Sequence, residues 1–570
     1  MSEKSKNAQI LAARSWRMWV VFALLSVAVG FILTKQFSLY SKDQAFLQNQ
    51  GDARTIRTML IPAHRGLITD RNGEPLAVSA PVASIWVDPK YIDMQHPHLN
   101  RLSQIIEMPH GSLVERLANN ADRRFVYLRR QVTPETAEAI RLLGIPGVNV
   151  DREYRRFYPA GEVTAHLVGF TNVDGEGQEG MELAFNDWLT GEHGSKLVMR
   201  DRVGRTIRHI RSIQDARQGN ELQLSIDLRL QYMAYRELKA VVEAHQADAG
   251  SVVIMDTQTG EVLAMVNQPS YNPNDRSRLE PAALRNRAMT DLFEPGSTVK
   301  PMTVAAALMT ERFTPDTVIR TSPGVMRVRS ATIRDFRDYG DLSLTGIITK
   351  SSNVGTVRLV MDMEHDRLPN LLQNFGFGQL SHTGFPGERA GHLPDLRERQ
   401  VVERATMSYG YGFSVTPLQL AQSYIPFASD GIFYPASLIK HEGEPQGTRI
   451  MPSGVGNQIL DMMETVIGPE GTARRAAVEG YRVAGKTGTA HRVGSAGYNR
   501  EEYTAFFAGL APVSDPRLAI VVIVDNPKGR EIYGGEVAAP VFARVAAGSM
   551  RLLNLDPDRW PEPKTQVAGR

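Results

Sequence analysis

The stretch Phe293-Glu-Pro-Gly-Ser-Thr-Val-Lys-Pro301 decides how the rest of the chain is interpreted. Its Pro-Gly pair ends the preceding structure, and the apolar run Val304–Leu308 predicts that a helix follows. Ser297 then lies in the first turn, with Lys300 three residues later on the same face. A desolvated lysine can take the proton of a serine hydroxyl, and N–H groups at a helix start can stabilise an oxyanion. Taken alone, the stretch fits a helix-capping serine that happens to precede a lysine better than a catalytic pair.

Two further motifs make the catalytic interpretation the stronger one. Ser351-Ser352-Asn353 follows a helical segment and is expected on a turn between two helices. Lys486-Thr487-Gly488-Thr489 is expected on a strand, where Gly488 would let an extended substrate lie along the strand edge. Lys486 supplies a cation, and the two threonines supply hydroxyls for a carboxylate. The order S-x-x-K, S-x-N, K-S/T-G over about 190 residues is a strong signal.

A nucleotide-binding loop is the competing interpretation of the third motif. Residues 480–487 also match the P-loop pattern, and residues 518–525 resemble a strand that ends in a magnesium-binding aspartate. A P-loop must follow a strand and open a helix. Here residues 473–479 are helix-like and residues 488–494 cannot form the required helix, so an NTPase is disfavoured.

Composition sets outer limits on the function. The chain has 570 residues, of which 42% are hydrophobic and 22% are charged, as in an ordinary globular protein. A net charge of +3 is far too small for a nucleic-acid coat, so no nucleic-acid partner is expected. The absence of cysteine excludes disulfides, thiol nucleophiles and Cys-ligated metal centres. We expect neither a metal site nor a cofactor.

A single membrane anchor is predicted near the N-terminus. Met18–Thr34 is a run of 17 uncharged residues, just long enough to cross the hydrocarbon core, with Trp16 and Trp19 suited to an interfacial belt. Lysines and arginines dominate the preceding tail, which predicts a cytoplasmic N-terminus. Residues 35–40 offer no small-residue cleavage site, so the segment is expected to stay attached, with about 530 residues outside the cytoplasm.

Periodicity and turn residues divide the rest of the chain. The expected parts are a cytoplasmic tail (1–17), the anchor (18–34), a stalk (35–56), a non-catalytic pedestal (57–218), an α+β domain (219–555) and a C-terminal tail (556–570). In the pedestal, Asn72-Gly73 predicts a hairpin and residues 98–145 are expected to be helical. In the α+β domain, strands are expected at 222–227, 251–256, 261–265, 503–510 and 518–525, with helices through much of 302–440 and at 540–553.

The motifs resemble those of the class B penicillin-binding proteins. Arg65-Gly-Leu-Ile-Thr-Asp-Arg-Asn-Gly73 and Gly180-Met-Glu182 are similar to two motifs of their pedestal, and Tyr409-Gly-Tyr-Gly412 to the stretch before their third catalytic motif. The resemblance implies a single-pass membrane helix, an elongated dimerisation-type pedestal and a penicillin-binding transpeptidase domain. That domain would be an antiparallel sheet sandwiched by helices, with a helical subdomain. Nothing matches the paired glutamates of the class A glycosyltransferase domain, so glycan polymerisation is not expected.

The resemblance also implies how the first two motifs act. Ser297 would be the acylated nucleophile and Lys300 the base that activates it. Ser351 and Asn353 would shuttle protons and hold the donor peptide. In the implied reaction Ser297 attacks the D-Ala-D-Ala carbonyl, D-Ala leaves, and an amine of a neighbouring stem peptide takes the acyl group. Neither the base nor the role of Ser351 follows from spacing.

For the third motif the resemblance implies carboxylate binding. Lys486, counted with the catalytic residues, would act with Thr487, Gly488 and Thr489 on the terminal carboxylate of the stem peptide or of a β-lactam antibiotic. The backbone N–H groups of Ser297 and Thr489 would form the oxyanion hole.

Other activities share some of these features. A serine β-lactamase seldom carries an anchor and a pedestal, and a β-lactam sensor would need further membrane spans and a cytoplasmic signalling domain. A purely structural scaffold would not need the three motifs together. A D,D-carboxypeptidase, in which water takes the acyl group, remains the main alternative.

The implied setting is cell division. The chain is most similar to the septal class B type of Gram-negative bacteria in its length, its short tail and the stretch from Glu294 to Pro301. This implies an inner-membrane protein with a periplasmic catalytic domain, working with a membrane glycan polymerase and other division proteins. An elongation-type enzyme is the alternative, because no residue chemistry distinguishes a septum from a side wall.

Overall fold

Five antiparallel strands form the sheet that carries the third motif. The computed structural model describes residues 3–41, 45, 46, 49, 52, 55–200, 206–494 and 497–559. The strand order is β10 (Val262–Gln268), β9 (Ala249–Asp256), β19 (Leu518–Asp525), β18 (Gly497–Ala511) and β17 (Ala484–Gly494). The strands β9, β10 and β19 are buried on both faces along almost their whole length, and each contains a continuous run of at least four apolar residues. Within the described residues β17 pairs only with β18, so it forms an edge of the sheet.

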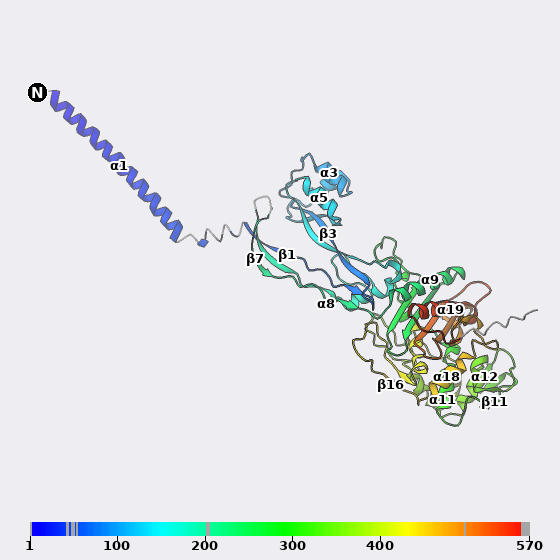
Figure 1. The fold of residues 1–570 in the computed structure, drawn as a ribbon. Coiled ribbons are helices and arrows are strands. Elements are labelled where there is room, and N and C mark those ends of the chain that lie inside the picture. The colour runs from blue at the N-terminus through cyan, green and yellow to red at the C-terminus, as the bar shows by residue number, and fades with distance from the viewer. Residues whose placement is uncertain are drawn as a thin grey trace, which may run out of the picture. The chain divides into compact units, whose positions relative to one another are not determined.

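Helices cover both faces of this sheet (Figure 1). They are α9 (Leu228–Ala244), α19 (Gly534–Leu552), α10 (Arg287–Thr290) and α16 (Pro417–Gln422). Gly250 faces α9, whereas the hydroxyl of Ser251 donates to Asn267, which also accepts the N–H of Ala288 in α10. Neighbouring residues of a strand point to opposite faces, so α9 and α10 lie on opposite sides of the sheet.

The segment between β10 and β17 is mostly helical. Its helices include α11 (Lys300–Leu308), α12 (Leu344–Lys350), α13 (Asn353–Met361), α14 (Arg367–Asn374), α15 (Val401–Met407), α17 (Ile425–Ala428) and α18 (Val455–Glu464). Three two-stranded ribbons accompany them: β11 (Val318–Ile319) with β14 (Leu342–Ser343), β12 (Val325–Val328) with β13 (Ala331–Arg334), and β15 (Ile432–Phe433) with β16 (Thr448–Arg449). The helix α11 is buried along its whole length, which fixes the residues at its start.

The chain forms two compact units, each built from three separate segments. Unit 1 comprises Met1–Ala63, Val82–Glu153 and Glu192–Arg217, and unit 2 comprises His64–Pro81, Tyr154–Gly191 and Gln218–Arg570. Both pedestal motifs of the sequence therefore lie in unit 2, together with the three motifs that contain Ser297, Ser351 and Lys486.

A buried ionic cluster joins the two pedestal motifs inside unit 2. Glu182 has no exposed surface and accepts hydrogen bonds from Nε of Arg65 at 2.5 Å and from Nε of Arg156 at 2.6 Å. Nearby, β2 (Ile68–Thr69) pairs with the start of β3 (Pro75–Val87) and, in parallel, with β8 (Leu222–Gln223). These contacts tie the N-terminal segments of unit 2 to the residues that follow 218.

Unit 1 has a small core of its own. Its elements are α3 (Leu99–Ile105), α4 (His110–Ala118), β4 (Val126–Val132), α5 (Pro134–Leu142), parts of β3 and β5 (Val148–Phe157), and a separate sheet of β1 (Ile56–Ile61), β6 (Gly194–Arg200) and β7 (Thr206–Gln214). Among the described residues one helix is long and apolar enough to cross a membrane: α1 (Glu3–Ser41), over Trp16–Ser41. This agrees with a single span at the predicted place, although the helix runs past Thr34.

Most predicted elements are present, and four need correction. The hairpin at Asn72-Gly73 and the strands around 251–265 and 503–525 are confirmed. The region 98–145 is not all helical, because β4 lies within it. The strand at 222–227 spans only two residues, the segment 473–479 has only a 3-10 turn, and the last helix begins at Gly534, with Pro540 inside it. The predicted domain limits stay a prediction.

Candidate active site

A tight turn presents Ser297. It lies half-buried in a 3-10 turn over Gly296–Val299 that leads directly into α11, so the predicted helix follows the motif. Gly296 has a φ of +52° and donates its N–H to the carbonyl of Gly410 at 2.9 Å. A Cβ on Gly410 would lie 2.0 Å from the carbonyl oxygen of Gly296, so only glycine fits at position 410. The Tyr409–Gly412 stretch therefore supports the turn of the first motif.

Lys300 is fully buried and meets the second motif. Its Nζ donates to Ser351 O at 2.5 Å, to Ser351 Oγ at 3.1 Å and to Asn353 Oδ1 at 2.7 Å. Burial and then the charge of Lys486 hold the pKa of Lys300 well below its ordinary value, and the carboxylate of Asp335 opposes them. A buried lysine with a lowered pKa can carry the uncharged amine that a general base requires.

The second motif lies on the predicted turn between α12 and α13. Ser351 ends α12 in the left-handed conformation, with a φ of +60°. Ser352 caps α13 by accepting the N–H of Gly355 at 2.9 Å. This turn aims Ser351 and Asn353, which are two residues apart, at Lys300.

Asp335 anchors this turn, and the sequence analysis missed it. Its carboxylate accepts the hydroxyl of Ser352 at 2.6 Å and the backbone N–H groups of Asn353 at 2.5 Å and Val354 at 3.0 Å. The Nδ2 of Asn353 also donates to Arg334 O at 2.9 Å. Only an acidic residue after a short strand marks this position in the sequence, and that signal is too common to single it out.

The third motif runs along β17. Lys486 has no exposed surface, and its Nζ donates to Thr487 O at 3.2 Å; burial lowers the pKa of Lys486 to about 7. The hydroxyls of Thr487 and Thr472 lie 2.9 Å apart, and Thr489 Oγ1 accepts the N–H of Gly534 at 3.0 Å. Both motif threonines remain half-buried, so their hydroxyls are held at the edge of the sheet.

Packing against the core gives a further reason for a glycine at position 488, beside the predicted room for a substrate. A Cβ at this position would lie 1.8 Å from the ring of Phe506 on the neighbouring strand β18. Phe506 is fully buried and its ring also packs on Phe293 at a centroid distance of 5.4 Å. Gly488 therefore makes room for a core aromatic ring that lies between the first and third motifs.

The three motifs come together in unit 2. A Cβ on Gly296 would lie 3.9 Å from Thr489 O, the turn of the first motif packs on β17, and Lys486 acts electrostatically on Lys300. Within the described residues the hydroxyl of Ser297 forms no hydrogen bond, so the site pairs Lys300 with the second motif rather than with the serine. No group of three or more His, Asp or Glu side chains in the described part of the chain could hold a metal ion. The continuation of the third motif as a strand rules out the P-loop.

Comparison with known proteins decides the family. Residues 250–547 match the model of the penicillin binding protein transpeptidase domain, and residues 60–224 match that of the penicillin-binding protein dimerisation domain. Peptidoglycan D,D-transpeptidase FtsI of Escherichia coli K12 is 43% identical over 95% of this chain and 93% of its own length. The chain belongs to the penicillin-binding proteins. The resemblance to class B members seen in the motifs is thereby confirmed.

Solved structures of the family have the same fold. The transpeptidase domain of penicillin-binding protein 3 from Burkholderia pseudomallei is 40% identical, covering 59% of this chain and 98% of its own, with a TM-score of 0.55. Penicillin-binding protein 3 of Mycobacterium tuberculosis, solved with aztreonam, is 27% identical. The match covers 88% of this chain and 98% of the Mycobacterium chain, with a TM-score of 0.69. The expected order of a pedestal followed by a transpeptidase domain is confirmed.

Proposed function

We propose that the protein is a peptidoglycan D,D-transpeptidase that works through a serine acyl-enzyme and is acylated by β-lactams. The observation that carries this proposal is the arrangement of Lys300, which is fully buried, bonded to Ser351 and Asn353, and three residues from Ser297. The name of the Escherichia coli relative and the aztreonam complex of the Mycobacterium relative support the same chemistry.

In this proposal the first two motifs carry out the bond changes. The uncharged amine of Lys300 takes the proton of Ser297 as its Oγ attacks the carbonyl of the penultimate D-Ala. The C–N bond to the last D-Ala breaks, and its nitrogen leaves with the proton relayed through Lys300 and Ser351. Asn353 holds the donor peptide. An amine of a second stem peptide then attacks the ester and regenerates the serine.

The third motif holds the donor and its developing charge. Lys486, Thr487 and Thr489 bind the terminal carboxylate, and Gly488 keeps the strand close to the core ring beneath it. The N–H groups of Ser297 and Thr489 stabilise the oxyanion, a kind of contact that contributes about 3–4 kcal/mol in other hydrolases.

Labelling with a fluorescent penicillin tests the nucleophile. We expect one covalent adduct per chain, mapping to the peptide that contains Ser297, and none in Ser297→Ala with the fold retained. Ser437, which also has a lysine three residues later, is the matched control, because Lys440 donates to Arg71 O instead. An adduct that persists in Ser297→Ala, or that maps to another serine, would refute the assignment.

We further propose that the enzyme cross-links the division septum, with α1 in the inner membrane, a cytoplasmic N-terminus and a periplasmic catalytic domain. Its partners would be a membrane glycan polymerase and other division proteins. The Escherichia coli relative and the one candidate span found among the described residues support this setting. Depletion should give long filaments with intact side walls, and a fluorescent fusion should gather at mid-cell. Rounded cells with dispersed fluorescence would point to the elongation type instead.

A further inference from the structure

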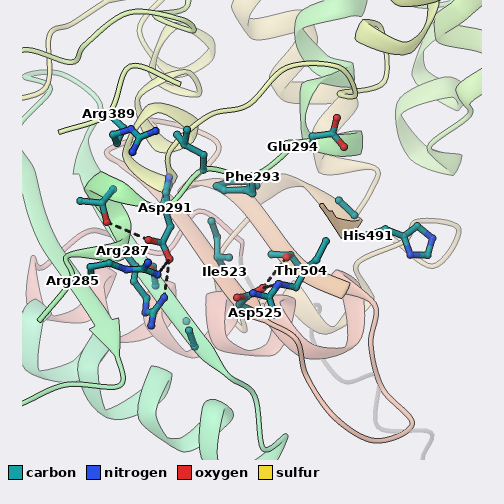
Figure 2. Close-up of a pocket in the computed structure, with 18 residues that line it drawn as sticks. Arg285, Arg287, Asp291, Phe293, Glu294, Arg389, His491, Thr504, Ile523 and Asp525 are labelled. Atoms are coloured by element: carbon teal, nitrogen blue, oxygen red, sulfur yellow. Dashed lines mark hydrogen bonds and ion pairs between the residues drawn. The ribbon is translucent and has the colours of Figure 1, made fainter. Parts of the chain in front are cut away.

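A cleft of about 400 Å³ opens beside the third motif. One wall is formed by residues of β9, β17, β18 and β19, and the other by several residues between 285 and 294, Arg389 and Pro417 (Figure 2). On β17 the lining residues are 490–492, which directly follow Thr489. The cleft is therefore the next space along the strand from the hydroxyls proposed to bind the terminal carboxylate.

Positive charge is in excess at one end of this cleft. Arg285 and Arg287 both pair with the same oxygen of Asp291, at 3.0 and 2.9 Å. Arg389 is held beside α10 because its N–H donates to Met289 O at 3.1 Å, while its exposed guanidinium forms no ion pair in the described part of the chain. Arg285 and Arg287 thus share one carboxylate, and Arg389 has no anionic partner in the described part of the chain.

The other acidic groups that line the cleft do not pair with Arg389 in the described part of the chain. At the other end Asp525 accepts the hydroxyl of Thr504 at 3.0 Å and lies 3.5 Å from Nε of Arg492 (Figure 2). Above the sheet, Glu294 accepts the N–H of Gly412 at 2.8 Å. Neither carboxylate is paired with Arg389.

The direction of β17 shows which part of a substrate reaches this space. A peptide added antiparallel to the strand, with its terminal carboxylate at Thr487 and Thr489, places its preceding residues beside residues 490–492, at about 3.3 Å per residue. Two or three residues of an extended peptide are enough to reach the mouth of the cleft.

We infer that Arg389 and its neighbours Arg285 and Arg287 bind a carboxylate carried by the stem peptide upstream of its D-Ala-D-Ala end. This inference rests on the proposed function and extends it, because it makes the charge of the donor peptide a determinant of its selection. The guanidinium of Arg389 suits a carboxylate because it can donate two parallel hydrogen bonds.

Two synthetic pentapeptide donors test the inference on the full-length protein in detergent. They end in D-Ala-D-Ala and differ only in carrying free carboxylates or carboxamides on the upstream acidic residues. The measurement is the kcat/KM for release of D-Ala. We expect the unmodified protein to prefer the free acid about tenfold, as for a charge-assisted hydrogen bond.

Three variants test whether Arg389 causes the preference for the free-acid donor. It should fall to about twofold or less in Arg389→Gln, persist in part in Arg389→Lys, and remain complete in Arg399→Gln, an exposed arginine of the same segment outside the cleft. Equal rates for the two donors, or an unchanged preference in Arg389→Gln, would overturn the inference. Penicillin labelling of Ser297 separates the two proposals: a protein that is not labelled refutes the proposed function, whereas a labelled protein without the preference refutes only the subsite.

Discussion

The Nζ of Lys300 lies 2.7 Å from Oδ1 of Asn353, and this contact joins the start of α11 to the start of α13. The lysine is fully buried and forms no ion pair among the described residues, so a backbone carbonyl, a hydroxyl and an amide satisfy its hydrogen bonds. Such a setting favours the uncharged amine, because neutral partners do not offset the loss of hydration. Because Lys300 is held as a base by the second motif, its role can be separated from that of Lys486 by experiment.

Substituting the two lysines should separate activation from binding. Lys300→Ala should block acylation by every donor, because no group then takes the serine proton. Lys486→Ala and Thr489→Ala should chiefly weaken donors that carry a carboxylate, by about 1.5–3 kcal/mol. Acylation rates with a carboxylate-bearing and an uncharged donor measure this. Equal losses for both donors in Lys486→Ala would show that the roles are wrongly divided.

The pH dependence of acylation should reveal the electrostatic link between these lysines. With an uncharged donor the rate should rise with pH as Lys300 loses its proton, since the amine and not the ammonium acts as base. The charge of Lys486 lowers the pKa of Lys300, so removing that charge in Lys486→Met should move the rising limb to higher pH. Single-turnover rates across the pH range measure the midpoint. A rising limb of the pH–rate profile that stays in place or moves to lower pH in Lys486→Met would contradict the electrostatic link between the two lysines.

The packing beneath Gly488 predicts a large effect from one methyl group. Gly488→Ala would drive a Cβ to 1.8 Å from the Phe506 ring, so β17 or the ring must move. We expect a loss of about 1–3 kcal/mol in stability and slower penicillin labelling. Adding Phe506→Leu to Gly488→Ala should restore part of the stability and part of the labelling rate. Phe506→Leu alone should only lower the stability of the protein. A double-mutant cycle on the thermal midpoint and the labelling rate tests this; additive effects would rule the contact out.

The buried cluster at Glu182 should be important for folding and not for chemistry. Glu182→Ala leaves Arg65 and Arg156 buried without their anion and should cost about 3–5 kcal/mol. The control is Glu138→Ala, which removes an exposed ion pair with Arg141 and should cost less than about 1 kcal/mol. Thermal unfolding measures both variants. A labelling rate per folded molecule that falls in Glu182→Ala would assign the cluster a role in the site.

Local patterns predicted the parts of the site that depend on nearby residues. The helix after Ser297, the turn at Ser351–Asn353 and the strand at Lys486 each follow from a few neighbouring residues, and all three are present. The strand β4 was missed although Val126, Leu128 and Val132 show its alternation, because the flanking helical pattern was extended across it.

Contacts between distant residues were beyond the sequence argument. Asp335, which anchors the turn of the second motif, and Phe506, which packs under Gly488, meet their partners only after the chain has folded. The two pedestal motifs were each noticed, but neither shows that Arg65 pairs with Glu182 or that both belong to the unit with the active site. Composition and periodicity carry no information about such pairings.

The interleaving of the two units has a consequence for the order in which the protein matures. Ile68 of β2 takes Leu222 of β8 as its partner, 154 residues further along the chain. At roughly 5–20 residues per second, the ribosome delivers that partner roughly 8–30 seconds after the strand itself. Arg65 and Glu182 are both made before residue 218 and can already neutralise each other during this interval. Until residue 222 has been made, the edge of β2 that pairs with β8 stays open, and unpaired strand edges favour aggregation, so a chaperone that covers this edge would protect the nascent unit.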